Sequence, residues 1–217
     1  MATRTYQQMC PVARALDAVG ERWTLLIVRE LLLGPKRFKE LMARLPAMGT
    51  NRLSARLKTL VALGVVERST LPAPADVAVY ELTALGEGLR PIVLGLASWG
   101  ARLPFDQRVD PKSARAELIA LGLAAQSPRE VSSGLHESYE FHVGDEHFHV
   151  SVDDGAVVAR SGPSRREPAV EVSCELPTFA RLAWGDLSPS RALRSGEASI
   201  AGRPTAFTRA FRVLAAA

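Results

Sequence analysis

The sequence lacks the long apolar runs that membrane proteins and secreted precursors carry. No run reaches the ~18 residues that a membrane-spanning helix needs, and the N-terminal stretch MATRTYQQMCPV has no apolar core of the kind found in signal peptides. Cysteine is also scarce, because Cys10 and Cys174 are the only two in 217 residues. Two cysteines are too few for a disulfide scaffold and fit a reducing compartment. We therefore expect a cytoplasmic protein.

The short motifs that mark common enzymes and metalloproteins are missing too. There is no HExxH, CxxC, P-loop or GxGxxG pattern, and no serine or cysteine with a recognisable base partner. We expect no enzyme activity, no cofactor and no metal. The nearest approach to a site is His142, His147 and His149, since alternation along a strand places His147 and His149 on one face, where Glu140 or Asp145 could add an oxygen ligand. A solvated strand face fits the same pattern, and we favour it.

Acidic residues are scarce in one part of the chain, although the net charge is only +4. Residues 1–108 hold 15 Lys+Arg against 9 Asp+Glu, whereas residues 109–217 hold 12 against 14. Within the first half, the segment 34–58 has seven basic residues and a single acid, Glu40. A solvated surface normally mixes the two signs. This basic segment therefore predicts a polyanionic partner such as double-stranded DNA.

The basic segment coincides with the pattern of two short helices joined by a turn. Apolar residues repeat at helical spacing over residues 38–45 and 50–63, with Pro46 and Gly49 between the two runs. Thr50 is suited to cap the second helix. The side of that helix opposite its apolar stripe is polar and basic, as in a helix that enters the DNA major groove. The helix pair alone fits the solvated face of a helical bundle equally well.

These positions predict specific DNA contacts. Base edges would be contacted from the second helix by Thr50, Asn51, Arg52, Ala55 and Arg56, with the two arginines best placed for bidentate guanine contacts. Two strand-like runs at residues 65–70 and 77–82 then predict a β-hairpin wing with one basic residue. The side chains expected to contact the DNA backbone are Lys36, Arg37, Lys39, Lys58 and, from the wing, Arg68.

A long apolar helix is predicted after the wing. Thr83 can cap it, it runs to about Leu103, and Pro91 should bend it or lie near its start. Symmetric DNA sites call for paired recognition helices, and an apolar helix at the edge of a small domain needs a partner. We therefore predict a homodimer. The residues expected to form the dimer contact are Leu89, Ile92, Leu96 and Trp99. Packing of this helix on its own chain is the alternative.

Several stretches, taken in order, resemble the HxlR-type regulators, which are winged helix-turn-helix relatives of the MarR group. The resemblance rests on CPVARALDAVGERWTLLIVRELLLGPKRFKEL, GTNRLSARLKTLVALGVVER, YELTALGEGL and LASWG, and it covers residues 8–103. It implies a dimeric bacterial DNA-binding transcription factor. The corresponding domain, residues 1–104, would have a mainly α winged helix-turn-helix fold that serves DNA binding and dimerisation.

Some members of that family sense oxidants or electrophiles through a cysteine just before the first helix, and Cys10 occupies the matching position. A helix dipole stabilises a thiolate at the helix N-terminus. The resemblance therefore implies a redox role for Cys10. An inert, partly buried thiol fits the position as well, since a whole second domain is available for sensing.

The chain changes character after a polar, proline-containing stretch at residues 105–117, where we place the domain boundary. A helical run is followed by alternating runs with turn signals at Gly144 and Gly155, and by further short strands and helices up to the C-terminus. This pattern predicts an α+β domain over residues 112–217, with helices packed on one face of an antiparallel sheet.

The segment DLSPSRALRSGEASIAG, residues 186–202, together with the strands before it and the helix after it, is similar to the end of the sterol carrier protein type two fold. This resemblance covers residues 112–217. It implies a hydrophobic tunnel between sheet and helices that holds a lipid or another apolar small molecule, which in a regulator would be the effector. A filled core that only supports the dimer is the alternative.

Together these features predict a homodimeric transcriptional regulator that binds a double-stranded DNA operator and responds to an apolar small-molecule or lipid effector. Repression is favoured over activation. One alternative is a lipid or small-molecule carrier protein, which leaves the basic segment 34–58 unexplained. Another is a regulator that acts through a thiol switch at Cys10 without a ligand.

Overall fold

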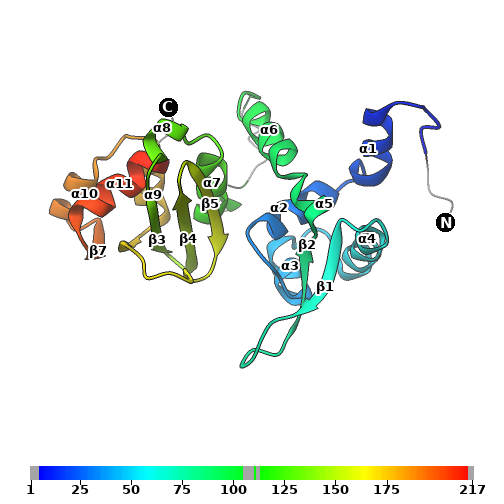
Figure 1. Ribbon diagram of the computed structural model, residues 1–217, viewed down its shortest axis with the longest axis horizontal. Coiled ribbons are helices and arrows are strands. Elements are labelled where there is room, and N and C mark those ends of the chain that lie inside the picture. Colours follow the sequence, from blue (N-terminus) through cyan, green and yellow to red (C-terminus); the bar gives the residue numbers. More distant parts are fainter. Residues whose placement is uncertain (1–4, 105–109, 111–112, 215–217) are drawn as a thin grey trace. The chain divides into compact units, whose positions relative to one another are not determined.

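The computed structural model describes residues 5–104, 110 and 113–214, and the chain divides into two compact units between Leu96 and Ala97 (Figure 1). We call them the N-terminal unit and the C-terminal unit. The predicted domain limits, 1–104 and 112–217, stay predictions, because the boundary segment includes residues outside the described ranges. Among the helices of the described residues, none has the length and hydropathy that a bilayer crossing needs.

The N-terminal unit consists mainly of helices, with one two-stranded antiparallel sheet. Its elements, in chain order, are α1 (Pro11–Val19), α2 (Thr24–Leu32), α3 (Phe38–Arg44), α4 (Thr50–Ala62), β1 (Val66–Thr70), β2 (Ala78–Leu82), α5 (Ala84–Glu87) and α6 (Arg90–Gly100), the last of which extends past the division between the units. The strands β1 and β2 form the hairpin that projects in Figure 1. Helices α3 and α4 with this hairpin confirm the predicted winged helix-turn-helix fold.

The core of the N-terminal unit gathers apolar side chains from α2, α3, α4 and the start of the hairpin. Ile27, Leu41, Leu53 and Leu57 are all 1% exposed or less. Leu53 and Leu57 are one helical turn apart, as are Leu41 and the partly exposed Phe38, so each helix buries one stripe. This packing fixes which side of α4 faces away from the core.

Glycine and proline determine where the helices of this unit begin. Gly49 has a φ of 76° at the N-cap of α4, a backbone conformation that favours glycine, and Thr50 is the first helical residue. The prediction that Thr50 is the cap was wrong by one residue. The predicted helix over residues 83–103 is two helices, α5 and α6. In a continuous helix Pro91 would lack the N–H needed for the backbone hydrogen bond, and its ring would clash with the carbonyl four residues earlier. Pro91 is the second residue of α6. It therefore lies near the start of a helix, which was one of the two predictions, and does not bend one.

The C-terminal unit is a five-stranded sheet with helices, in the strand order β5-β4-β3-β6-β7. Its elements are α7 (Ala116–Ala124), α8 (Arg129–Ser132), β3 (His136–Val143), β4 (Glu146–Asp153), β5 (Ala156–Ser161), β6 (Val170–Cys174), α9 (Leu176–Ala183), α10 (Pro189–Ser195), β7 (Ala198–Gly202) and α11 (Pro204–Leu214). The predicted α+β class is confirmed.

The sheet is mixed, so the prediction of an antiparallel sheet was wrong in one pairing. Strand β6 runs parallel to β3, whereas the pairs β3–β4, β4–β5 and β6–β7 are antiparallel. The physical reason is the connection at residues 162–169, which returns past β4 and β3 before β6 begins. Its last residue, Ala169, donates its N–H to the carbonyl of Ser138 at 2.8 Å. We call residues 162–169 the crossover segment.

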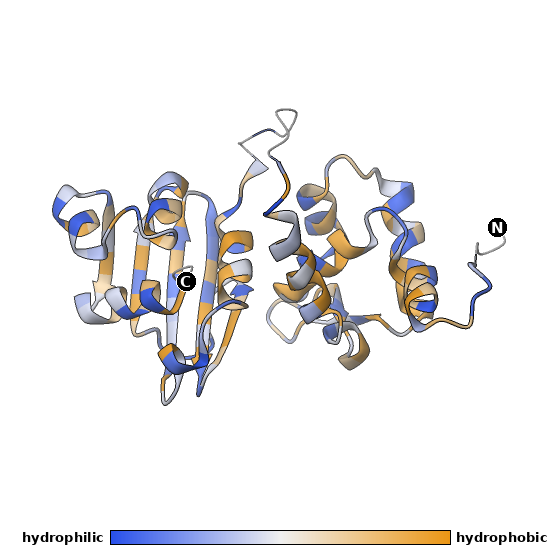
Figure 2. Cartoon of the chain, turned by 90° about the horizontal axis from the view of Figure 1, so that it is seen from above, coloured by the Kyte–Doolittle hydropathy of each residue, from blue (hydrophilic) through white to orange (hydrophobic). Residues whose placement is uncertain are grey.

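Phenylalanine rings fill the space between the sheet and its helices. Phe141 and Phe148 stack at a centroid distance of 5.2 Å. Phe179 meets both rings edge-on at 5.6 Å, and Phe211 meets Phe141 edge-on at 5.8 Å. With Phe207, all five rings are 3% exposed or less. Figure 2 shows the strands changing between hydrophobic and hydrophilic along their length. The period of two places one apolar face on this cluster and leaves a polar face opposite.

Candidate nucleic-acid interface

Helix α4 presents a polar, basic side to the exterior of the N-terminal unit. Its core stripe, Leu53, Leu57 and Leu60, is 1% exposed or less, and the residues between these positions point outward. The sequence of α4, TNRLSARLKTLVA, contains no acid. The exposed residues on this side are Thr50, Asn51, Arg52, Ser54, Ala55 and Lys58. This surface has the charge and the helical format of a major-groove reader.

Arg56 differs from the other predicted base-reading residues, because it is held by an acid. Its Nη2 lies 3.3 Å from Oε2 of Glu21, in the connection between α1 and α2, and its side chain is 20% exposed. Sequence reasoning missed this partner, since Glu21 lies 35 positions away and belongs to no local pattern. Any contact that Arg56 makes to a base edge competes with this ion pair, whereas among the described residues no acid forms an ion pair with Arg52.

Four of the five predicted DNA-backbone residues are exposed: Arg37, Lys39, Lys58 and Arg68. The guanidinium of Arg68 on β1 lies 5.4 Å from the ring centroid of Tyr80 on β2, a cation–π contact that holds it against the wing. The fifth, Lys36, is only 6% exposed. Its main chain pairs with Tyr80, with Lys36 N to Tyr80 O at 3.0 Å and the reverse bond at 2.8 Å. The side chain is buried beside the wing, which argues against the predicted phosphate contact for Lys36.

Helix α6 has one inward and one outward apolar side. Val93 is 9% exposed, and the partly buried Leu89, the residue before α6, packs against the core of the N-terminal unit. Ile92, Leu96 and Trp99 follow one another at helical spacing on the outer side and are 51%, 47% and 61% exposed. Of the four predicted dimer residues, Leu89 therefore packs within its own chain, and the other three lie on an uncovered apolar surface.

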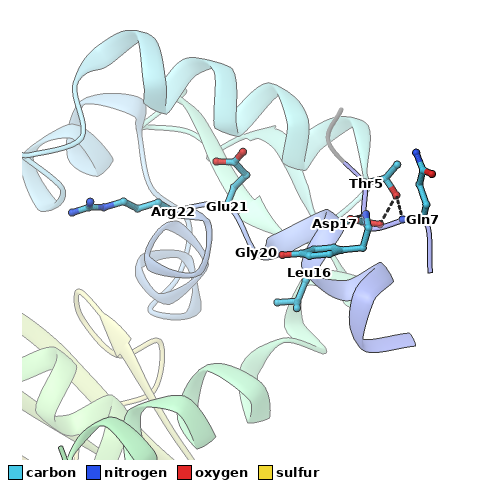
Figure 3. Close-up of a pocket in the computed structure, with 8 residues that line it drawn as sticks. Thr5, Gln7, Leu16, Asp17, Gly20, Glu21 and Arg22 are labelled. Atoms are coloured by element: carbon cyan, nitrogen blue, oxygen red, sulfur yellow. Dashed lines mark hydrogen bonds between the residues drawn. The ribbon is translucent and has the colours of Figure 1, made fainter. Parts of the chain in front are cut away.

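Helix α1 also leaves apolar side chains uncovered. Ala13 is its buried residue, whereas Val12 and Leu16 are 66% and 44% exposed. Between the end of α1 and the preceding segment lies a cleft of about 610 Å³, lined by residues that include Tyr6, Asp17 and Glu21. In Figure 3 the Glu21 carboxylate points toward α4, while Arg22 extends away.

Cys10 occupies the N-cap of α1. Its backbone is extended, with φ −124° and ψ 126°, its carbonyl accepts the N–H of Arg14 at 3.0 Å, and its side chain is half-buried. The predicted position at the start of the first helix is thus found, and its redox role stays a prediction.

A helix-turn-helix pair with a basic outer surface, followed by a β-hairpin wing, defines the winged helix-turn-helix class of DNA-binding proteins. The chain belongs to the HxlR-like helix-turn-helix family, whose family model matches residues 18–107. The resemblance predicted from the sequence is therefore confirmed, and this protein is a transcriptional regulator.

Two sequence relatives agree with the family assignment. The chain is 41% identical over 93 residues to the uncharacterized HTH-type transcriptional regulator YvaP of Bacillus subtilis (strain 168), covering 42% of this chain and 86% of YvaP. It is 37% identical over 92 residues to YodB, an HTH-type transcriptional regulator of the same strain, covering 42% and 82%. The structure of the redox regulator HypR in its oxidized form shares 32% identity over 45% of this chain and 100% of HypR, with a TM-score of 0.42.

The second half of the chain matches a different family model. Residues 117–215 match the SCP-2 sterol transfer family, in agreement with the resemblance to sterol carrier protein type two. The two halves of the chain thus match two different family models.

Proposed function

We propose that this protein is a homodimeric transcriptional repressor that binds a double-stranded DNA operator through α4. The observation that carries the proposal is the side of α4 opposite its buried leucines, which is exposed and has no acidic residue. Lysine and arginine on such a surface release counterions from DNA phosphates, which supplies a large share of the affinity. The functional domains would be residues 1–104, which bind DNA, and residues 112–217, which bind the effector.

Within this proposal, side chains on the first turns of α4 read base edges. Asn51 and Arg52 are exposed near the start of the helix, where recognition helices contact bases. Thr50 and Ala55 border them, and Arg56 joins only where the Glu21 ion pair opens. Arg37, Lys39, Lys58 and Arg68 then bind phosphates on either side of the groove.

The homodimer is supported by two uncovered apolar surfaces in the N-terminal half of the chain. Ile92, Leu96 and Trp99 form one on α6, and Val12 and Leu16 form the other on α1. Large exposed apolar groups that recur at helical spacing mark association surfaces. A two-fold dimer would present two copies of α4 to successive major grooves.

We assign effector binding to the C-terminal domain. The match of residues 117–215 to the sterol transfer family supports an apolar small-molecule or lipid effector. The five packed phenylalanines weigh against an open tunnel at the sheet–helix interface, because a ligand there would have to displace rings that are 3% exposed or less. Native mass spectrometry of the purified protein for a co-purified lipid tests this part directly.

Footprinting on the DNA upstream of the protein's own coding region tests the regulator proposal. A protected site with two-fold symmetry and half-sites about 10 base pairs apart, or a multiple of that, is expected. In the same assay Leu96→Asp should lose protection and sediment as a monomer, whereas Trp184→Asp, a change at another exposed apolar residue, should keep both. A pure carrier protein would leave the DNA unprotected.

A thiol switch at Cys10 is the second candidate, because the residue lies at the start of α1 as the family resemblance implies. If it operates without a ligand, Cys10→Ser should lose every response of DNA binding to oxidants, and Cys174→Ser should keep it. An unchanged response of Cys10→Ser removes this candidate.

A further inference from the structure

A cluster of two histidines and a glutamate lies on the polar face of the C-terminal sheet. Glu140 and His142 belong to β3, and His147 belongs to β4, directly opposite His142 in the register of the two strands. Because successive side chains alternate between faces, these three point away from the phenylalanine cluster to which Phe141 and Phe148 belong. The cluster therefore shares no space with the packed core.

The ligand atoms of these three side chains converge. Nε2 of His147 lies 2.7 Å from Oε1 of Glu140, and Nε2 of His142 lies 3.8 Å from the same oxygen. The two imidazole rings stack with centroids 4.2 Å apart and planes 19° from parallel. One ligand atom from each of the three residues can be chosen such that all lie within 4.8 Å of one another.

The glutamate is held in place by the crossover segment. Its Oε2 accepts the backbone N–H of Ser164 at 3.0 Å, and the whole residue is 9% exposed. The neighbouring His149 is engaged by the same segment, with Nδ1 2.8 Å from the carbonyl oxygen of Gly162. Metal-binding carboxylates are commonly oriented by such outer hydrogen bonds. The crossover segment thus leaves Oε1 of Glu140 to face the two histidines.

We propose that Glu140, His142 and His147 form a binding site for a divalent transition-metal ion, with Zn²⁺ as the best match. Two imidazoles and one carboxylate are the ligand set of open three-residue zinc sites, and the hard cations Mg²⁺ and Ca²⁺ prefer oxygen ligands. The proposal goes beyond the DNA-binding function. The metal ion would lie on the polar face of the sheet, whereas an apolar effector would occupy the opposite face.

The observed distances are within reach of that ion. Metal–ligand bonds of about 2.0–2.1 Å at tetrahedral angles separate the ligand atoms by about 3.3 Å. The His147–Glu140 distance would have to lengthen and the His142–Glu140 distance to shorten, each by about half an ångström, as the ion replaces the hydrogen bond. Both rings would also turn so that their Nε2 atoms converge. Their side chains are 42% and 36% exposed, which leaves room for that motion.

A fourth ligand has access from one side. A surface cleft of about 390 Å³ borders the cluster and is lined by His142, Ser173 and Glu175 among others. Water or a small anion in this cleft could complete a tetrahedral site, as in zinc sites with three protein ligands.

The test is a Zn²⁺ titration of the full-length, chelator-treated protein in competition with a chromophoric chelator, without DNA. One ion per chain is expected, with affinity lowered at least tenfold in His142→Ala and His147→Ala. His136→Ala is the matched control, because His136 lies on the same face of β3, is 62% exposed and pairs with Asp153 instead. It should bind Zn²⁺ as the wild type does.

A second variant separates loss of the site from loss of the fold. Glu140→Gln keeps an oxygen that can accept the Ser164 N–H, so we expect an unchanged far-UV circular dichroism spectrum with weakened Zn²⁺ binding. Co²⁺ added to the wild type should give visible d–d absorption that Glu140→Gln loses. Absence of stoichiometric binding to the wild type, or binding that survives in both histidine variants and in Glu140→Gln, would overturn the site. Neither outcome touches the DNA-binding proposal, because no DNA is present.

Discussion

The two units of this chain carry their polar chemistry in different ways. The N-terminal unit displays it along one exposed helix, α4, which carries Asn51, Arg52 and Lys58. The C-terminal unit assembles it across strands, where Glu140 and His147 meet only through the register of β3 with β4. A surface that one helix carries can be recognised from spacing alone. A cluster that several strands share depends on pairings that the sequence does not specify locally.

The largest expected effects come from deleting core side chains in either unit. Phe148→Ala removes a ring that stacks on Phe141 and contacts Phe179, and should lower the free energy of unfolding of the C-terminal unit by about 3–5 kcal/mol. Leu57→Ala should cost the N-terminal unit about 2–5 kcal/mol. Calorimetry and DNA titration together test the contrast, because only Leu57→Ala should abolish DNA binding. Equal loss of DNA binding in Phe148→Ala would show that the units do not act separately.

A smaller effect, confined to the C-terminal unit, is expected from its ion pair between β3 and α11. Burial raises the pKa of Glu137, but hydrogen bonds from Arg209 and Tyr139 outweigh it and hold the pKa below its ordinary value. The carboxylate therefore stabilises the fold above its unfolded pKa of about 4.3, and this contribution is lost as the pH falls through the lower folded value.

Glu137→Gln should accordingly cost about 1.5–3 kcal/mol at pH 7, as expected for charged hydrogen bonds. Thermal unfolding of wild type and variant at pH 7 and at about pH 3 measures the change. The gap between the two melting temperatures should narrow at the acidic pH. A gap that stays constant would mean that ionisation of Glu137 does not stabilise this unit.

In the N-terminal unit, Arg52→Ala should cost about 1–3 kcal/mol of operator affinity and relax the sequence preference at one position. The reason is that Arg52 is exposed on the first turn of α4. Competition binding with single-base operator variants measures both effects. Arg194→Ala, an exposed arginine of the C-terminal unit, is the control and should change neither. Unchanged affinity and preference for Arg52→Ala would mean that another side of α4 meets the DNA.

The smallest effect is expected from the ion pair that holds Arg56. Glu21→Gln removes the acid 3.3 Å from the guanidinium and frees it for DNA. Surface ion pairs contribute about 0.2–1 kcal/mol, so affinity should rise about 1.4- to 5-fold. Fluorescence anisotropy with the operator can resolve this. A fall in affinity would instead indicate that the pair orients Arg56 or α4.

Much of the fold was predictable because its signals are local. The leucine spacing of α4, the hairpin runs and the strand alternation of β3 and β4 all reflect short-range periodicity. The parallel pairing of β6 with β3 was not, since it depends on how the crossover segment travels. The burial of Lys36 was missed for a related reason, because its main chain pairs with Tyr80, 44 positions later.

The same distinction between local patterns and tertiary contacts separates the site residues that were predicted from those that were missed. Arg52 and Lys58 were found from the helical pattern, whereas the Glu21 partner of Arg56 and the joining of Glu140 to His147 come from tertiary contacts. For the histidines, alternation favoured the pair His147 and His149. His147 and His149 do lie two residues apart on β4, as predicted, but the register pairs His147 with His142, and His149 contacts the Gly162 carbonyl.

The most direct test of the central claim, that α4 and its basic surroundings bind DNA, is an anisotropy titration of the purified protein with its own upstream DNA at two salt concentrations. Four exposed phosphate-binding candidates per chain, Arg37, Lys39, Lys58 and Arg68, give eight in a dimer. Eight contacts predict a loss of affinity of about 10⁴-fold between about 50 and 200 mM salt. Salt-independent binding, or no binding at the lower concentration, would contradict the account.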